Sequence, residues 1–139
     1  MKISTKGRYG LRIMIDLAVT DPENYVSIKS IAARQQISEK YLEQIISSLN
    51  KSGLVKSVRG AQGGYKLTRA PSDYTVGQIL RVIEGSLAPV DCLSDDVNKC
   101  PRCEDCVSLY VWEKIFAAVN EVVDKITLQE LINHSQSCK

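Results

Sequence analysis

The first half of the chain repeats one pattern, in which apolar residues at helical spacing are followed by a short polar break. Three stretches carry apolar positions every three or four residues, as one face of a helix does: residues 7–19, those after Ser27 and those after Ser38. Ser27 and Ser38 can cap the second and third helices, because a serine hydroxyl accepts a hydrogen bond from the first turn. Gly53 suits the end of the third helix.

After Gly53 the pattern becomes strict alternation, which is typical of strands. Residues 54–59 and 65–68 alternate around the Gly-rich segment 60–64, whose glycines tolerate positive φ, and this predicts a two-stranded hairpin. Two helices, a short turn, a third helix and a Gly-tipped hairpin form the order of a winged helix-turn-helix. We therefore expect a mainly α fold with a small β-hairpin wing, in which the third helix enters the DNA major groove.

The second half predicts a short helix, an irregular segment and one long helix. Thr75 and Gln78 form a capping box that opens the short helix, and residues 85–106 show little periodicity. Thr127 and Glu130 form another capping box that opens a last short helix. The long helix carries a heptad-like seam, which we predict as a homodimer interface: Leu109, Trp112, Phe116, Val119, Val123 and Ile126.

A second apolar stripe runs beside this seam: Val111, Ile115, Ala118 and Val122. One stripe can face the protein's own body and the other a second subunit. The alternative is a single wide surface that faces the core. We favour dimerisation, because one small domain can hardly cover both stripes.

Composition and charge narrow the class of protein. The 139 residues are 44% hydrophobic and 24% charged, which argues against a disordered chain. No run approaches the ~20 apolar residues of a membrane span, and the start lacks the pattern of a signal peptide, so we expect a cytoplasmic protein without membrane contact. Residues 1–70 hold 12 of the 18 Lys and Arg but five of the 16 Asp and Glu. This asymmetry indicates binding to a polyanion, the alternative being chance clustering of surface charge.

The charged and polar residues of this basic half fit DNA. Gln44 can pair with the edge of adenine and Glu43 can accept from cytosine, although Glu43 can equally form a surface salt bridge. Arg59 leads into the Gly-rich turn and can reach a minor groove. Basic side chains of the first and third helices would contact phosphates: Lys6, Arg8, Lys40 and Lys51. No strand–loop–helix follows Gly63 and Gly64, so a nucleotide-binding loop is rejected.

Three motifs resemble the Rrf2 family of bacterial transcription factors: Lys6–Tyr9, Tyr41–Gln44 and the wing segment Gly53–Tyr65. The resemblance covers nearly the whole chain. It implies a homodimer whose long helices cross, with a winged helix at each end and a roughly palindromic double-stranded operator. Together, the residues and the resemblance predict these DNA contacts: Lys6, Arg8, Tyr9, Ser38, Lys40, Tyr41, Glu43, Gln44, Lys51, Arg59, Gly60 and Gly63.

Four of the five cysteines fall within fifteen residues: Cys92, Cys100, Cys103 and Cys106. In a reducing compartment such a cluster is more often a metal or redox site than a disulfide framework. Four thiolates can bind zinc or an iron–sulfur cluster, and their spacing does not decide between the two. Cys138 is expected to be an uninvolved tail thiol.

The resemblance to the IscR-like members of the family favours an iron–sulfur cluster, with 2Fe–2S preferred to 4Fe–4S and zinc as the alternative. Three loop cysteines hold the cluster in those members, and Cys92, Cys100 and Cys106 match their places. The place of those members' histidine ligand is taken here by Leu109, which cannot ligate. We therefore predict Cys103 as the fourth ligand, the alternative being a ligand from the partner subunit or from an N-terminal residue.

These observations predict a DNA-binding regulator whose operator binding is tuned by the cluster. Its targets would be genes of iron–sulfur cluster biogenesis or of sulfur and iron metabolism. The alternatives are a cluster-free, CymR-like repressor of cysteine metabolism, whose N-terminal half fits equally well, and a zinc or thiol redox regulator. No nucleophile with a positioned base is found in the sequence, so an enzyme is not expected. The predicted segments are a winged helix-turn-helix domain (1–84), a cysteine-rich loop (85–107) and a dimerisation helix with a C-terminal tail (108–139).

Overall fold

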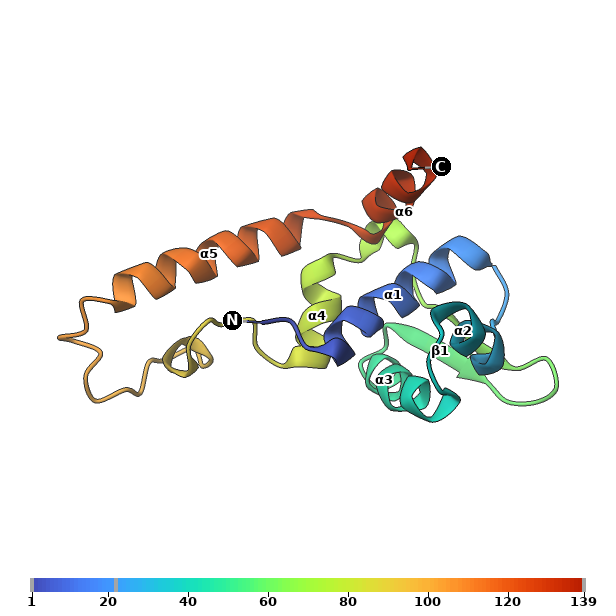
Figure 1. Cartoon of the computed structure of the whole chain (residues 1–139), viewed down its shortest axis with the longest axis horizontal. Coiled ribbons are helices and arrows are strands. Elements are labelled where there is room, and N and C mark those ends of the chain that lie inside the picture. The colour runs from blue at the N-terminus through green and yellow to red at the C-terminus, as the bar shows by residue number, and fades with distance from the viewer. Residues whose placement is uncertain (1, 22, 139) are drawn as a thin grey trace.

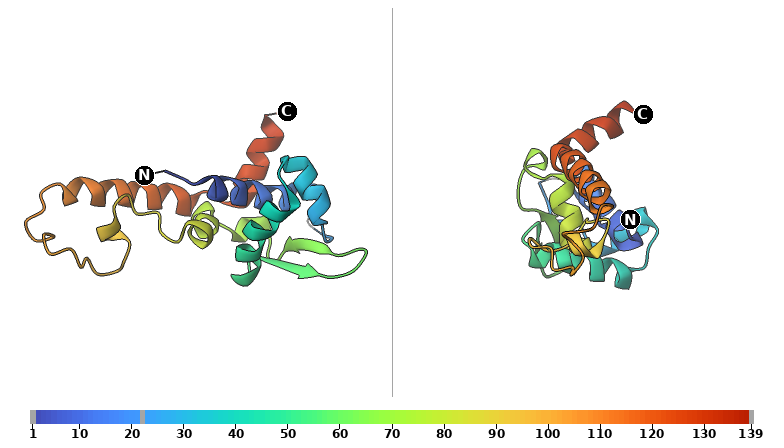
Figure 2. Two further views of the ribbon diagram at one scale, coloured as in Figure 1. Left: turned by 60° about the horizontal axis from the view of Figure 1, so that its bottom comes forward. Right: turned by 90° about the vertical axis from the view of Figure 1, so that its left-hand side faces the viewer.

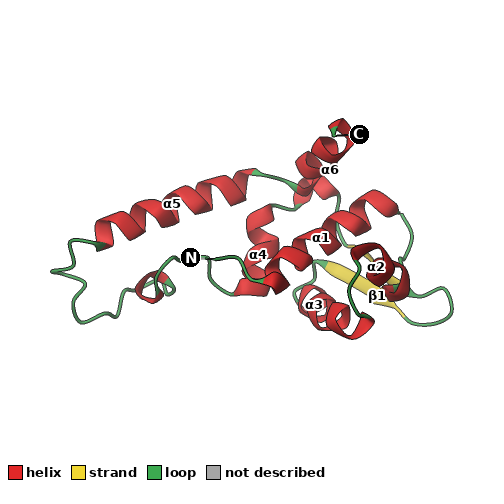
Figure 3. Cartoon of the chain, in the orientation of Figure 1, coloured by secondary structure: helices red, strands yellow, loops and turns green. Residues whose placement is uncertain are grey.

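The computed structural model describes residues 2–21 and 23–138, and it has the winged-helix order that the sequence predicts. The winged-helix unit, called the DNA-binding unit below after the role that the sequence predicts for it, contains α1 (Thr5–Thr20), α2 (Ile28–Gln35), α3 (Glu39–Lys51) and the hairpin β1 (Val55–Val58) with β2 (Gly64–Leu67). A 3₁₀ turn η1 (Pro71–Asp73) leads into α4 (Val76–Glu84). The loop that follows contains η2 (Asp91–Leu93), and the chain ends with α5 (Leu109–Lys125) and α6 (Leu128–Ser137). Figures 1 and 3 show this arrangement.

Polar side chains fix where the helices begin. Ser27, Ser38 and Thr75 each accept a hydrogen bond from a backbone N–H of the first turn, as predicted. Thr75 and Gln78 form the complete capping box. At α6 only the hydroxyl of Thr127 is engaged, by the N–H of Glu130, so the structure shows one half of the predicted box.

The first helix starts earlier than the apolar pattern indicates. It begins at Thr5 rather than Gly7, because the hydroxyl of Ser4 accepts the N–H of Gly7 and supplies the cap. Ser4 is itself tied to the end of α4, since its backbone N–H and its hydroxyl both contact a carboxylate oxygen of Glu84, at 3.1 and 2.5 Å. The start of α1 is therefore anchored to the segment that leads into the cysteine loop.

The hairpin has antiparallel register, and its base is held by one buried tyrosine. Val55 lies opposite Leu67 and both are buried against α1 and α3. Val26 adds an isolated bridge to Tyr65, on the free edge of β2. Tyr74 is fully buried, and its hydroxyl donates to the carbonyl of Leu54 at 2.7 Å while accepting from backbone N–H groups that follow β2.

The last helix belongs to the core of the DNA-binding unit. Leu128 and Ile132 of α6 are buried in the same apolar cluster as Ile13 and Leu17 of α1. The backbone joins the two ends as well, because the N–H of Leu128 donates to the carbonyl of Tyr74 at 2.9 Å. The segment predicted as a C-terminal tail is thus a structural part of the N-terminal unit.

The long helix α5 extends away from this unit, as Figure 1 shows in orange. None of its residues is buried. Its C-terminal part packs on α4, in a second apolar cluster built on Val76, Leu80 and Leu87. The loop before α5 and the hairpin lie at opposite ends of the molecule in both orientations (Figures 1 and 2). The contact of α4 with α5 is therefore one route by which the loop could be coupled to α3 and the hairpin.

No helix in the described ranges, 2–21 and 23–138, is long and apolar enough to cross a membrane.

Candidate nucleic-acid interface and cysteine loop

The outer face of α3 presents four of the side chains predicted to contact DNA. Lys40, Glu43, Gln44 and Lys51 are exposed, while the opposite face of the helix is buried. None of these four side chains forms a hydrogen bond or ion pair within the described ranges 2–21 and 23–138. The structure therefore leaves their functional groups available, and Glu43 has no partner for the salt bridge that was its alternative.

Tyr9 and Tyr41, both predicted DNA contacts, lie against each other. Their rings meet edge to face with centroids 6.0 Å apart, and the guanidinium carbon of Arg12 lies 4.9 Å from the centroid of the Tyr9 ring. Both rings are half-buried and pack on the main core. The two tyrosines thus set the distance between α1 and α3, and any contact they make with DNA would come from their partly exposed edges.

The side chain of Ser38 caps its own helix. Its hydroxyl accepts a hydrogen bond from the N–H of Tyr41 at 3.1 Å, so it caps α3 in addition to the predicted DNA contact.

Lys6 and Arg8 lie in the first turn of α1, where Arg8 is exposed and donates to the hydroxyl of Thr5 at 3.0 Å. These two cations lie at the start of α1.

The wing tip depends on backbone conformations that favour glycine. Gly60 has φ of 119°, and its carbonyl accepts the N–H of Gly63 at 3.0 Å, which closes the turn. A side chain at Gly63 would collide with the carbonyl oxygen of Val58. Arg59 precedes this turn and is exposed. The turn therefore holds Arg59 at the tip of the hairpin, as the sequence predicts.

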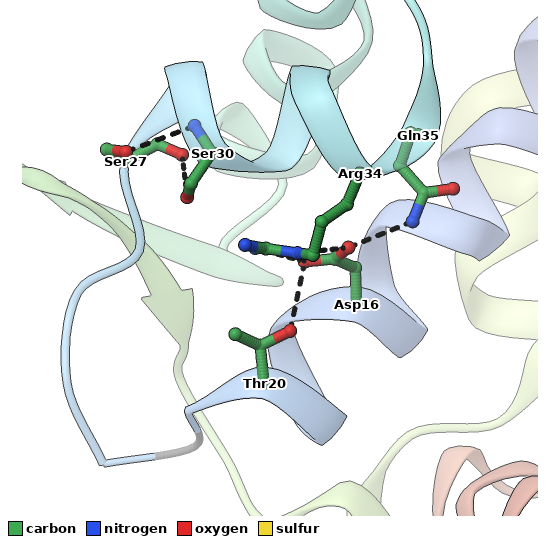
Figure 4. Close-up of polar contacts among 6 residues, drawn as sticks. All are labelled: Asp16, Thr20, Ser27, Ser30, Arg34 and Gln35. Carbon is green, nitrogen blue, oxygen red and sulfur yellow. Dashed lines mark hydrogen bonds and ion pairs between the residues drawn. The ribbon is translucent and has the colours of Figure 1, made fainter.

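The buried carboxylate of Asp16 in α1 holds α2 through hydrogen bonds. The guanidinium of Arg34 donates to both oxygens of Asp16, at 2.7 and 3.0 Å, and Gln35 and Thr20 add hydrogen bonds at 2.9 and 3.4 Å (Figure 4). The side chain of Asp16 is 4% exposed. This hydrogen bond raises the pKa of Arg34, so the guanidinium stays charged. Sequence patterns did not single out this group, because Arg34 lies 18 residues from Asp16.

The four loop cysteines are half-buried, free thiols. Within the described ranges, no group of three or more His, Cys, Asp or Glu side chains is gathered closely enough to hold a metal ion. Cys106 lies directly before α5, and its sulfur is 3.4 Å from the hydroxyl of Ser108. That hydrogen bond, followed by those to the backbone of Leu109 and Ser108, lowers the pKa of the Cys106 thiol.

Cys138 is exposed at the end of α6, and its sulfur lies 3.6 Å from Nε2 of His134. It is remote in sequence from the loop cysteines. Its predicted role as an uninvolved thiol stays a prediction.

The two apolar stripes of α5 have different surroundings. Four members of the predicted dimer seam, Phe116, Val119, Val123 and Ile126, pack on the second apolar cluster of their own chain. In the neighbouring outer stripe Val111 is 47% and Val122 56% exposed, while Ile115 is half-buried. The other seam members, Leu109 and Trp112, are half-buried outside that cluster. The dimer interface stays a prediction, and the outer stripe contributes exposed apolar surface to α5.

Known proteins share the sequence pattern and the fold of this chain. Residues 3–134 match the model of the Rrf2 family, described as an iron-dependent transcriptional regulator. The chain is 48% identical to the HTH-type transcriptional regulator CymR of Bacillus subtilis strain 168, over 97% of this chain and 92% of that protein. The solved structure of CymR, the global cysteine regulator of B. subtilis, superposes with a TM-score of 0.78 at 46% identity, covering 96% of this chain and 98% of the other.

A solved structure of IscR from T. potens is equally similar, with a TM-score of 0.78 and 46% identity over 100% of this chain and 91% of that one. These similar proteins are regulators and not enzymes, and their winged-helix structures match the fold described above. The chain therefore belongs to the Rrf2 family and is a DNA-binding transcriptional regulator.

Proposed function

We propose that this regulator binds a roughly palindromic operator as a homodimer and that its cysteine loop tunes that binding. The observation that carries the proposal is the place of the loop. It connects α4, which packs on the DNA-binding unit, to α5, whose outer stripe is uncovered. A change in the loop can therefore alter how two DNA-binding units are held relative to each other.

DNA recognition in this proposal uses α3 and the wing together. Gln44 and Glu43 face base edges in the major groove, and Arg59 enters a minor groove from the wing tip. Lys40, Lys51 and the cations at the start of α1 contact phosphates. All of these side chains are exposed except that of Lys6, which is half-buried, and this exposure supports the assignment. Dimer symmetry would repeat the same contacts on a second half-site.

The proposed segments follow the packing. Residues 1–84 form the DNA-binding domain, 85–107 the cysteine loop and 108–139 the dimerisation segment, within which α6 returns to the DNA-binding domain. Only α5 then remains to contact a second subunit. Its outer stripe supplies apolar surface for that contact, next to the predicted seam.

The loop thiols have the chemistry of an iron–sulfur site, and we infer that Cys92, Cys100, Cys103 and Cys106 would hold a 2Fe–2S cluster. The four sulfur donors fit the group, while their present spacing does not gather three of them, so binding requires the loop to close. A bound cluster would supply a cross-link between the η2 turn and the start of α5. Zinc would use the same four donors.

The chain's own residues would transmit loop closure to the DNA-binding unit. Leu87 fixes the start of the loop against α4, and Cys106 stands directly before α5. The guanidinium of Arg81 binds Asp124 and Asn120, so it joins α4 to α5. A closed and an open loop would then favour different angles of α5, and operator affinity would follow the state that DNA stabilises. Genes of iron–sulfur assembly or of sulfur and iron metabolism are the proposed targets.

A cluster-free regulator of cysteine metabolism is the second candidate. It is supported by the separation of the loop thiols and by 48% identity to B. subtilis CymR. In that case the loop would act as a structural connection, and the signal would reach the protein in another way. The DNA-binding part of the proposal is the same for both candidates.

The test is an anaerobic visible absorption spectrum of freshly purified protein, with counts of iron, zinc and acid-labile sulfide. Iron with matching sulfide and charge-transfer bands supports the cluster, and Cys103→Ala should then weaken it while Cys138→Ala leaves it intact. Zinc without sulfide supports the metal alternative. Absence of metal after anaerobic reconstitution would overturn the cluster and leave the cluster-free regulator. Operator affinity equal in loaded and metal-free protein would overturn the tuning.

A further inference from the structure

Three cations gather on the outer face of the hairpin: Lys56 in β1, Lys66 in β2 and Arg69 just after β2. Lys56 lies directly opposite Lys66 in the antiparallel register. The adjacent pair, Val55 and Leu67, is buried, so alternation directs both lysines to the face away from the core. Like charges placed directly opposite each other destabilise a strand pair. This pair therefore costs the isolated hairpin stability and indicates an anion as its partner.

Neutral groups hold two of these cations in place. The ammonium of Lys66 donates to the backbone carbonyl of Glu23 at 3.0 Å and lies 5.5 Å from the centroid of the Tyr25 ring. The guanidinium carbon of Arg69 lies 4.5 Å from the centroid of the Tyr74 ring. In the described ranges 2–21 and 23–138, no carboxylate forms an ion pair with any of the three cations. The positions of Lys66 and Arg69 are thus restrained, while the charge of all three cations is not balanced by an ion pair.

A hollow of about 440 Å³ lies among the three cations, with Glu23 as the single acidic residue on its lining. Five of its eight lining residues are exposed. Sites for small molecules usually enclose most of the ligand in apolar walls, and this hollow does not. Its open shape and its charge suit a phosphate that is presented by a larger body.

We propose that Lys56, Lys66 and Arg69 bind a backbone phosphate of DNA outside the base pairs that α3 and the wing tip contact. Lys56 stands two residues before Val58, the last residue of β1, which is about 7 Å at the usual rise per residue. Lys56 is therefore close to the wing tip, while Arg69 lies beyond the other end of β2, and a duplex carries phosphates continuously past the bases that are read. The proposal rests on the DNA-binding role of the wing and extends its footprint.

The test compares two duplexes that share an operator recovered by selection. One duplex ends at the outermost base pairs of the half-sites, and the other continues for about ten base pairs on each side. The variant is the double substitution Lys56→Gln with Lys66→Gln, which keeps the length and polarity of both side chains. Lys125→Gln is the matched control, because Lys125 is an exposed lysine on α5. Affinity is measured from low to moderate salt.

Wild-type protein is expected to bind the longer duplex more tightly and with a steeper dependence on salt. The log–log slope should steepen by about 0.9 for each phosphate charge that is neutralised. The double variant should lose the extra slope of the longer duplex. With one phosphate neutralised at each of the two subunits this slope is about 1.8, which is about 12-fold in relative affinity between about 50 and 200 mM salt. Its affinity for the shorter duplex should stay within about twofold, and Lys125→Gln should behave as wild type.

Two outcomes overturn the proposal: no gain from the extension in wild-type protein, or an equal loss on both duplexes in the double variant. A third outcome, in which inorganic phosphate at matched ionic strength shifts the NMR signals of Lys66 while the extension adds nothing, would assign the cluster to free phosphate instead. Failure of wild-type protein to bind either duplex would contradict the proposed function itself. Equal binding of wild-type protein to both duplexes would remove only the flanking site.

Discussion

The guanidinium of Arg81 in α4 donates two hydrogen bonds to the carboxylate of Asp124 in α5, at 2.6 Å to Oδ1 and 3.0 Å to Oδ2. A third hydrogen bond, at 2.8 Å to the amide oxygen of Asn120, contacts α5 one helical turn before Asp124. Gly77 allows the two helices to approach, because a side chain there would collide with Asp124. We propose this contact as one route by which the loop and α5 influence the DNA-binding unit.

Replacing Asp124 with Asn should reduce stability by less than about 1 kcal/mol at neutral pH, since both partners are partly exposed and screened. The Arg81 hydrogen bond lowers the pKa of Asp124, so the stabilisation is fully present above the ordinary carboxyl pKa of about 3.9. It is lost as the pH falls through the lowered value. Urea unfolding of both proteins, from near pH 7 to progressively more acidic pH, should show a difference that shrinks below the ordinary carboxyl pKa. A difference that stays constant as the pH falls contradicts this account.

Asp16→Asn should destabilise the protein by about 1–3 kcal/mol, because it removes the charge that Arg34, Gln35 and Thr20 all contact in a buried position. Chemical denaturation measures the change. Asp95→Asn is the control, since its ion pair with Lys99 is exposed and should contribute less than about 0.5 kcal/mol. Equal effects of the two substitutions would show that the lock between α1 and α2 is unimportant.

Arg59→Ala should lower DNA affinity by about 1–3 kcal/mol, measured by fluorescence anisotropy on an operator duplex. Arg59→Lys keeps the charge and loses the planar group that suits a narrow minor groove, so it should recover only part of the loss. Folding should not change in either variant, because Arg59 is exposed and makes no ion pair in the described residues. Undiminished affinity in Arg59→Ala would remove the wing tip from the interface.

Val122→Asp should separate the dimer without unfolding the subunit, since Val122 lies on the outer stripe of α5. Val119→Asp should lower stability as well, because Val119 packs on the second apolar cluster of its own chain and would bury a charge there. Sedimentation velocity and thermal unfolding, read together, distinguish the two effects. Val97→Asp, an exposed position in the loop, is the control and should change neither. A Val122→Asp protein that still sediments as a dimer would place the interface elsewhere.

Local patterns predicted the order of elements well, because caps and apolar periodicity act within a few residues. Ser27, Ser38 and Thr75 cap the helices that the sequence assigned to them. The seam of α5 was harder to interpret. Heptad spacing identifies which face is apolar, but it does not identify what covers that face, and part of the seam covers α4 of the same chain.

The features that the sequence did not predict depend on contacts between segments that are distant along the chain. The opposition of Lys56 and Lys66 depends on the register of the hairpin, which the alternation of each strand does not fix alone. The contact of Asp16 with Arg34 depends on how α2 crosses α1. The loop cysteines were recognised from their spacing, but spacing does not indicate whether the thiols are gathered before a ligand binds.

The packing of Leu128 and Ile132 beside α1 has a consequence for synthesis of the protein. The DNA-binding unit lacks part of its core until α6 has left the ribosome, so it should fold only after α6 has been synthesised. A chain cut short by a premature stop before α6 would keep every DNA-contacting residue and still be unstable. Nonsense fragments of this regulator should therefore be degraded rather than occupy operators in place of the complete protein.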